Sequence, residues 1–132
     1  MPLTRQALHN SGEDIHLAVW PTVHDKHQIA SRHYAFEGRC FVVAAGQILQ
    51  SKDFPNELTM PEHFVSDTGR YVLRGGSCVI NPRGDYVLEP VFDREGLLIV
   101  DIDLDEAIKE KMTLDVSGHY QRNDIFDFRV RQ

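Results

Sequence analysis

The sequence predicts an α/β fold, because a strand, a helix and a second strand follow one another near its start. Residues 14–20 (DIHLAVW) first alternate and then become apolar, which is typical of a strand entering a core. Residues 25–39 carry apolar side chains at helical spacing and include Gly38, a residue type that commonly ends a helix. Residues 40–45 (CFVVAA) are a short apolar run that favours a buried strand. This order predicts a βαβ unit with a parallel pair of strands.

Shorter elements are expected around this unit. A helix is predicted over residues 2–10, where Pro2 suits the first turn. Residues 46–76 contain two prolines, several charges and little periodicity, so we expect a long surface excursion with one short helix at 61–67.

The second half of the sequence predicts a hairpin, a further strand and a helix. The residues NPRGD at 81–85 are typical of a turn. The predicted elements are strands at 77–80, 86–88 and 97–102 (LLIVDI) and a helix at 104–115 capped by Asp103. The tail from Val116 onward is polar and aromatic without a clear period, which makes it a candidate for packing on another subunit.

Composition and charge exclude several classes of function. The chain has 132 residues, enough for one modest domain, and a net charge of −6. It has no basic block, so we expect neither nucleic acid nor an anionic membrane as a partner. Its longest apolar run, residues 40–45, is far too short to span a bilayer, and its first residues do not form a signal peptide. These features predict a cytoplasmic location.

Neither the cysteines nor the histidines predict a reactive or metal-binding centre. Cys40 and Cys78 both lie in apolar strands, so we expect reduced, buried and unreactive thiols. His24 and His27 are three residues apart, but no third ligand accompanies them, so no metal or other cofactor is expected. His33, alone on a helix face, is expected to be a hydrogen-bonded core histidine.

The acidic residues also favour structural roles. Glu37 is expected to form an ion pair near the end of the main helix. Asp101, Asp103 and Asp105 alternate along the chain, which is typical of a solvated face, and the glycine of a calcium loop is absent. The sequence supplies no complete set of acid, base and nucleophile, so no residue is predicted to be catalytic.

Three separated segments carry a resemblance to a known family. They are HQIASRHYAFEGRCFVVAAGQ at 27–47, GGSCVINPRGDYVLEP at 75–90 and GHYQRNDIF at 118–126. In order and spacing they resemble the C-terminal half of a nitrilase, a member of the carbon–nitrogen hydrolase superfamily. The resemblance implies half of an α-β-β-α sandwich, in which two sheets lie between helical layers.

The same resemblance implies that the catalytic residues lie outside this chain. Nitrilases carry a catalytic Glu, a Lys and a nucleophilic Cys, and residues 1–3 (MPL) match the end of the segment that holds the nucleophile. Cys40 corresponds to a family cysteine that is not the nucleophile. We therefore expect the chain alone to be inactive, and the complete protein to hydrolyse a nitrile to a carboxylic acid and ammonia. An amidase or N-carbamoyl hydrolase of the same superfamily, and a non-catalytic fragment that only associates with complete subunits, are the alternatives.

The resemblance further implies a substrate-contacting segment and an oligomer. The segment is Trp20, Pro21, Thr22 and His24, although core packing of Trp20 is an equal alternative. Nitrilases assemble as dimers and larger spirals, which places the helices at 2–10 and 25–39 at a subunit contact. The sequence agrees, because Ile29, His33 and Phe36 share one helix face, and the neighbouring Ala30 and Tyr34 widen it beyond what one sheet needs.

Overall fold

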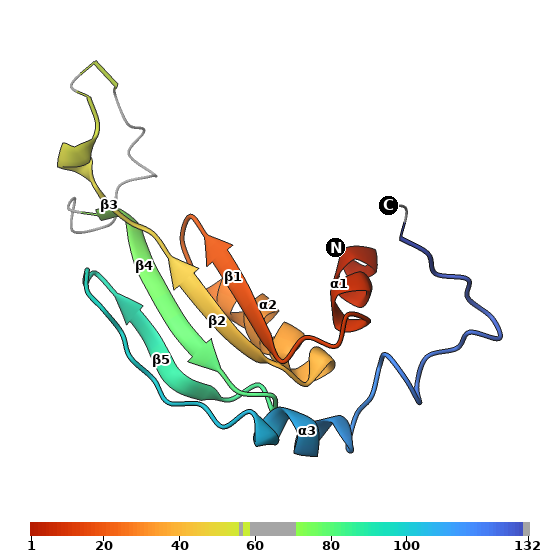
Figure 1. Cartoon of the computed structure of the whole chain (residues 1–132). Coiled ribbons are helices and arrows are strands. Elements are labelled where there is room, and N and C mark those ends of the chain that lie inside the picture. The colour runs from red at the N-terminus through yellow and green to blue at the C-terminus, as the bar shows by residue number, and fades with distance from the viewer. Residues whose placement is uncertain (56, 59–70, 131–132) are drawn as a thin grey trace.

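The computed structural model describes residues 1–55, 57–58 and 71–130 and confirms the predicted α/β class (Figure 1). Its helices and strands follow in the order α1 (Pro2–His9), β1 (Ile15–Trp20), α2 (Asp25–Gly38), β2 (Phe41–Gly46), β3 (Ile48–Gln50), the 3₁₀ turn η1 (Ser51–Asp53), β4 (Tyr71–Ile80), β5 (Tyr86–Phe92) and α3 (Asp105–Lys111). The predicted helix at 61–67 lies outside the described residues.

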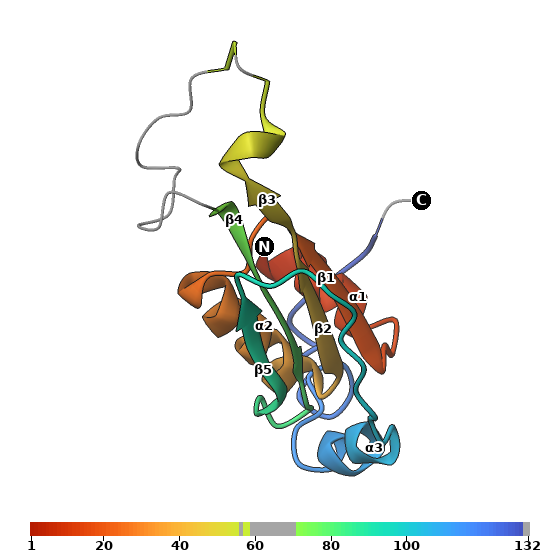
Figure 2. The same cartoon turned by 90° about the vertical axis from the view of Figure 1, so that its left-hand side faces the viewer.

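The strands form one five-stranded sheet. β1 pairs with β2 in parallel, with Leu17 opposite Val43, which confirms the predicted βαβ unit. β4 runs antiparallel to β2 and β3 on one side and to β5 on the other. β1, β3 and β5 each pair with a single strand, so they lie at the edges of the described sheet (Figure 2). The turn at 81–85 joins β4 to β5 as predicted, with Asn81 Oδ1 accepting the backbone N–H groups of Arg83 and Asp85.

Two predictions about residues 46–102 require correction. Part of the expected excursion is strand, because β3 and the first residues of β4 pair with each other across a long stretch of sequence. The predicted strand at 97–102 is wrong, since these residues have no regular secondary structure; Leu97 and Ile99 are 84% and 82% exposed. An apolar run becomes a strand only where a neighbouring strand offers its hydrogen bonds, and no strand among the described residues does so here.

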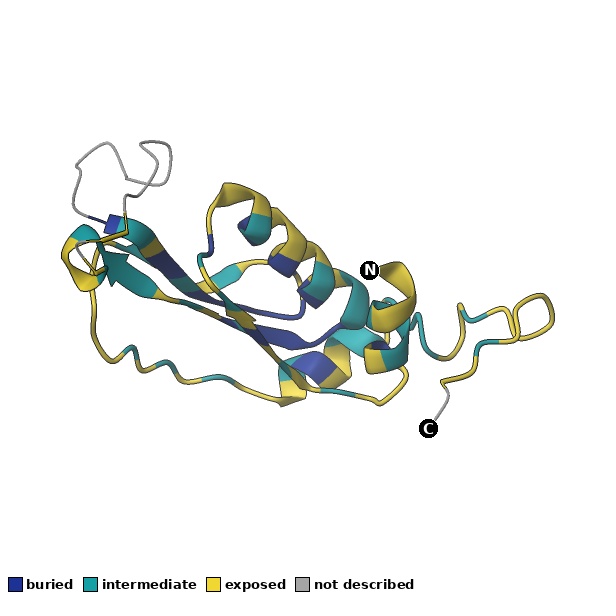
Figure 3. Ribbon diagram, turned by 90° about the horizontal axis from the view of Figure 1, so that it is seen from above, coloured by how far each residue is buried: buried dark blue, intermediate teal, exposed yellow. Residues whose placement is uncertain are grey.

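Helix α2 covers one face of the sheet and buries only part of its own surface there (Figure 3). Its buried residues are Gln28, Ser31 and Ala35, and Ala35 joins a core that includes Val42 and Ile80. The large apolar residues of α2 point outward instead, and His33 is exposed rather than a core histidine. Small residues at the interface let the helix backbone approach the sheet closely.

The opposite face of the sheet carries apolar residues of β1 that nothing in the described part of the chain covers. Alternate residues of a strand point to opposite faces, so Leu17 and Val19 lie opposite the helix-covered Ala18. They are 69% and 81% exposed, whereas Ala18 is buried. A sheet in a layered domain needs cover on each apolar face. This chain therefore forms half of the α-β-β-α sandwich.

Both cysteines are free and buried, as predicted. Burial raises the pKa of Cys40 to about 12 and that of Cys78 to about 11, so both remain thiols at neutral pH. Neither is a nucleophile as it stands in this structure.

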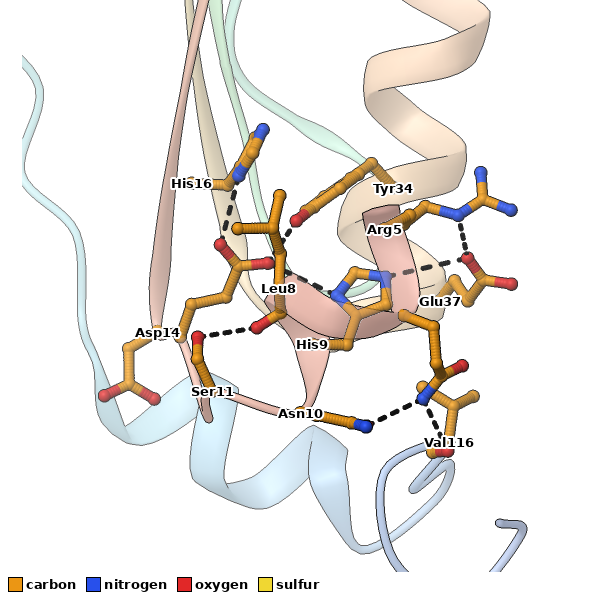
Figure 4. A network of polar contacts seen from close by, with 12 residues as sticks. Arg5, Leu8, His9, Asn10, Ser11, Asp14, His16, Tyr34, Glu37 and Val116 are labelled. Atoms are coloured by element: carbon orange, nitrogen blue, oxygen red, sulfur yellow. Dashed lines mark hydrogen bonds and ion pairs between the residues drawn. The ribbon is translucent and has the colours of Figure 1, made fainter. Parts of the chain in front are cut away.

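A network of polar side chains joins α1 to β1 and α2 (Figure 4). The His9 ring is buried and fills the space left by the missing side chain of Gly38. Its Nδ1 lies 3.3 Å from a Glu13 carboxylate oxygen, which also accepts a hydrogen bond from the Tyr34 hydroxyl. Glu37 pairs with Arg5, which confirms the expected ion pair.

Burial lowers the pKa of His9, although the neighbouring carboxylates of Glu13 and Glu37 act in the opposite direction. The folded chain therefore binds a proton at His9 less readily than the unfolded chain, whose histidine pKa is about 6.5. Stability gained from neutral His9 is present above this pH and is lost as the pH falls below it.

We predict that His9→Gln weakens the pH dependence of stability between pH 7.5 and 5.5. One titrating group changes the free energy of unfolding by at most about 1.4 kcal/mol per pH unit. Urea denaturation at several pH values measures this slope, and His119→Gln, at an exposed position, is the matched control. Equal slopes for the parent chain and His9→Gln would contradict the assignment.

Candidate functional site

The residues predicted to contact substrate gather at the carboxyl end of the parallel pair β1–β2. Trp20 is the last residue of β1, and the loop 21–24 leads from it into α2. In open α/β sheets, ligands bind outside the carboxyl ends of parallel strands. A cavity of about 490 Å³ lies there, bordered by Trp20, Pro21 and the end of β2. Pro21 and His24 are exposed and Thr22 is half-buried.

Trp20 has contacts on two sides. Part of its indole packs against the core, as the packing alternative expected, and its ring lies 4.8 Å from that of His27. Trp20 also borders a second cavity of about 350 Å³, together with Met1 and Thr4 of the α1 end. The start of α1 and the end of β1 therefore face the same space.

The aromatic rings of Trp20, His27 and His24 lie next to one another where the end of β1 meets the start of α2. His27 lies between Trp20 and His24, with 4.1 Å between the two imidazole centroids. Burial lowers the pKa of His27, and the neighbouring His24 acts in the same direction. His27 was not predicted as a site residue, although its spacing of three from His24 places both on one side of a helical turn.

Within the described ranges, no group of three or more His, Cys, Asp or Glu side chains is arranged to hold a metal ion. The described part of the chain also contains no helix that is both long enough and apolar enough to cross a membrane.

A pair of glycines in β4 holds the loop 21–24 in place. Val23 is fully buried, and its N–H donates to the carbonyl of Gly75 at 2.9 Å. Gly75 and Gly76 have φ values of +82° and +86°, which favour glycine. A side chain at Gly76 would overlap the Val23 carbonyl. The loop therefore approaches the strand at a distance that only glycine permits.

We predict that Gly76→Ala destabilises the chain by more than about 2 kcal/mol, because it adds a steric overlap to the strain of a positive φ. Gly12→Ala separates the two effects, since Gly12 has φ +75° but open space around it. Gly96→Ala, with neither feature, is the neutral control. Urea denaturation gives the three free energies, and equal losses at Gly76 and Gly12 would show that the overlap with Val23 is unimportant.

Comparison with known proteins agrees with this geometry. The chain is 37% identical over its whole length to an arylacetonitrilase of Trametes versicolor, covering 41% of that protein. It is 38% identical to an aliphatic nitrilase of Sinorhizobium fredii, with 98% of this chain and 42% of that protein covered. The chain thus spans about two fifths of the length of these curated relatives.

The fold is shared with a solved structure, a carbon-nitrogen hydrolase from Helicobacter pylori G27. That structure superposes with a TM-score of 0.69 at 15% identity and covers 95% of this chain and 43% of its own. The carbon-nitrogen hydrolase family matches residues 1–111. Because this match covers most of the sequence, the chain belongs to the carbon-nitrogen hydrolase family.

Proposed function

We propose that this chain is the C-terminal part of a nitrilase-type subunit which, when complete, hydrolyses a nitrile to a carboxylic acid and ammonia. The observation that carries the proposal is the shared cavity between Met1 and Trp20. By the resemblance, the nucleophilic Cys stands a few residues before α1. The end of β1 and the loop 21–24 then lie beside the reacting group.

The proposed chemistry assigns the bond-making steps to the rest of the subunit. A thiolate attacks the nitrile carbon and gives a thioimidate, after a base has taken the thiol proton. A cation stabilises the negative charge that develops on nitrogen, and water then releases the acid and ammonia. Cys40 and Cys78 do not replace the nucleophile, because both are buried thiols.

The proposed contribution of this chain is to shape the substrate pocket. Trp20, Pro21, Thr22 and His24 are the proposed contacts, since they border or adjoin the space at the strand ends. A small nitrile or amide is the proposed ligand. Because the relatives include an arylacetonitrilase and an aliphatic nitrilase, both aromatic and aliphatic nitriles are proposed as candidate substrates.

We predict that a chimera of the preceding part of the Trametes versicolor arylacetonitrilase joined to this chain releases ammonia from a nitrile, while this chain alone does not. Ammonia release from matched nitrile, amide and N-carbamoyl panels distinguishes the three enzyme classes. Cys40→Ala is the control and should retain turnover. Turnover by the isolated chain, abolished by Cys40→Ala, would overturn the proposal.

The same chimera tests the pocket residues. Trp20→Phe should change the ratio of kcat/KM between aromatic and aliphatic nitriles more than it changes stability. Earlier melting with an unchanged ratio would assign Trp20 to packing alone. An inactive chimera that nevertheless assembles with complete relatives would favour the non-catalytic alternative.

We also propose a cytoplasmic location and a homo-oligomer, with no nucleic acid or membrane as a partner. Two unpaired thiols suit a reducing compartment. The outer face of α2 is the proposed subunit contact, because Ile29 and Phe36 are 69% and 47% exposed there. Tyr34 contributes less to this face, since its hydroxyl donates a hydrogen bond to the Glu13 carboxylate.

We predict that the isolated chain sediments as a dimer or a larger species and that Ile29→Asp raises the dissociation constant at least about tenfold by placing a charge in the contact. Analytical ultracentrifugation measures this, with Ile108→Asp, on the exposed side of α3, as the matched control. A monomeric parent chain would contradict the proposal. If Ile29→Asp still associates and Val19→Asp does not, the contact lies on the exposed face of the sheet instead.

A further inference from the structure

The side chain of Gln28 lies where four segments of the chain meet. It is only 6% exposed and stands in the first turns of α2. Its Nε2 donates to the carbonyl of Val23 at 3.1 Å and to that of Gly76 at 3.0 Å. Its Oε1 accepts from the Cys78 thiol at 3.2 Å and from the Tyr86 hydroxyl at 3.1 Å.

These four contacts use the whole hydrogen-bonding capacity of the amide. The amide group has two N–H donors and a carbonyl oxygen with two lone pairs. Two backbone carbonyls face its nitrogen, while a hydroxyl and a thiol face its oxygen. The reversed orientation would set acceptors against acceptors, so the network fixes the direction of the side chain.

The contacts of Gln28 meet at the loop that carries the proposed substrate contacts. The carbonyl of Val23 belongs to this loop, and the carbonyl of Gly76 belongs to the strand that the loop approaches. The Val23 N–H already donates to Gly75. Gln28 therefore ties both sides of this close approach to the helix that follows the loop.

We propose that Gln28 is a positioning residue that sets the place of the loop 21–24 relative to the sheet, and so the shape of the pocket at the ends of β1 and β2. The effect on a substrate pocket rests on the proposed function, whereas the positioning of the loop rests on the four hydrogen bonds of Gln28 alone. Gln28 is not one of the proposed substrate contacts. It acts through its hydrogen bonds to the backbone of Val23 and Gly76.

The Gln28 amide is suited to this role, because neither methionine nor glutamate, the side chains of similar size, can form all four hydrogen bonds. Methionine fills a similar volume but forms none of the four bonds. Glutamate keeps the acceptors but directs oxygen at the two carbonyls, which leaves buried acceptors unpaired. A variant with methionine thus removes the hydrogen bonds with the least change in packing.

The test is amide hydrogen exchange, resolved by residue, on the 132-residue chain with Gln28→Met. The Val23 N–H should exchange at least about tenfold faster, because the close approach between the loop and β4 has lost two buried hydrogen bonds, one on each side. Gln6→Met makes the same chemical change in α1, where the Gln6 amide bonds to Asn10 and the Val116 carbonyl instead. Val42→Ala weakens the core cluster to which both Val42 and Val23 belong, so it shows the exchange pattern of a general loss of stability. Gln6→Met should leave Val23 exchange within about twofold of the parent value, because it removes no contact of the loop.

An acceleration confined to the loop 21–24 and to residues 75–76 supports positioning. Unchanged exchange at Val23, or an acceleration spread evenly over the core as in Val42→Ala, overturns it. If Gln28→Met does not fold, Tyr86→Phe carries the test, because it removes one donor to Gln28 Oε1 and should give the same pattern at smaller amplitude. Since no arm measures turnover, failure here is separate from failure of the proposed nitrile hydrolysis.

Discussion

The close contact between the loop 21–24 and the glycine pair of β4 is the constraint on which the rest of this structure depends. Val23 is buried beside Gly76, where any side chain would overlap the Val23 carbonyl, and its N–H donates to the Gly75 carbonyl. Helix α2 begins directly after this contact, at Asp25. Its path over the sheet is therefore set at its first turn, and the small side chains of Ser31 and Ala35 then let it lie close to the strands. The ends of β1 and β2 are left open beside the loop.

The sequence predicted those parts of the fold that depend on local pattern. The βαβ unit and the turn at 81–85 have clear periods and turn residues, and both are present. The pairing of β3 with β4 was missed, because it joins short segments far apart in the sequence. The apolar run at 97–102 was predicted as a strand, but its hydrogen bonds have no partner strand in the described chain. Periodicity measures apolar spacing and does not report which strand is adjacent.

The candidate site shows the same division. The position of Trp20 at a strand end follows from local pattern, whereas its proposed role as a substrate contact rests only on the resemblance. The sequence alone does not identify Gln28 as a positioning residue or His27 as the ring that lies between Trp20 and His24. Tyr86 and Cys78, which donate to Gln28, lie 58 and 50 positions away, so only the fold brings them together. The one indication of Gln28 that the sequence offers is a polar residue on the buried side of a helix. The apolar residues of α2 lie on the other side, which is where the prediction placed a contact.

The layering of the fold assigns different partners to the two apolar surfaces that this chain leaves exposed. In an α-β-β-α sandwich each sheet has helices on one face and a second sheet on the other. Helix α2 already covers one face of this sheet, so the face with Leu17 and Val19 is the place for the second sheet of the same subunit. The outer side of α2, with Ile29 and Phe36, is then the outside of the finished sandwich. The second sheet does not reach that surface, which is therefore the face proposed for the contact with another subunit.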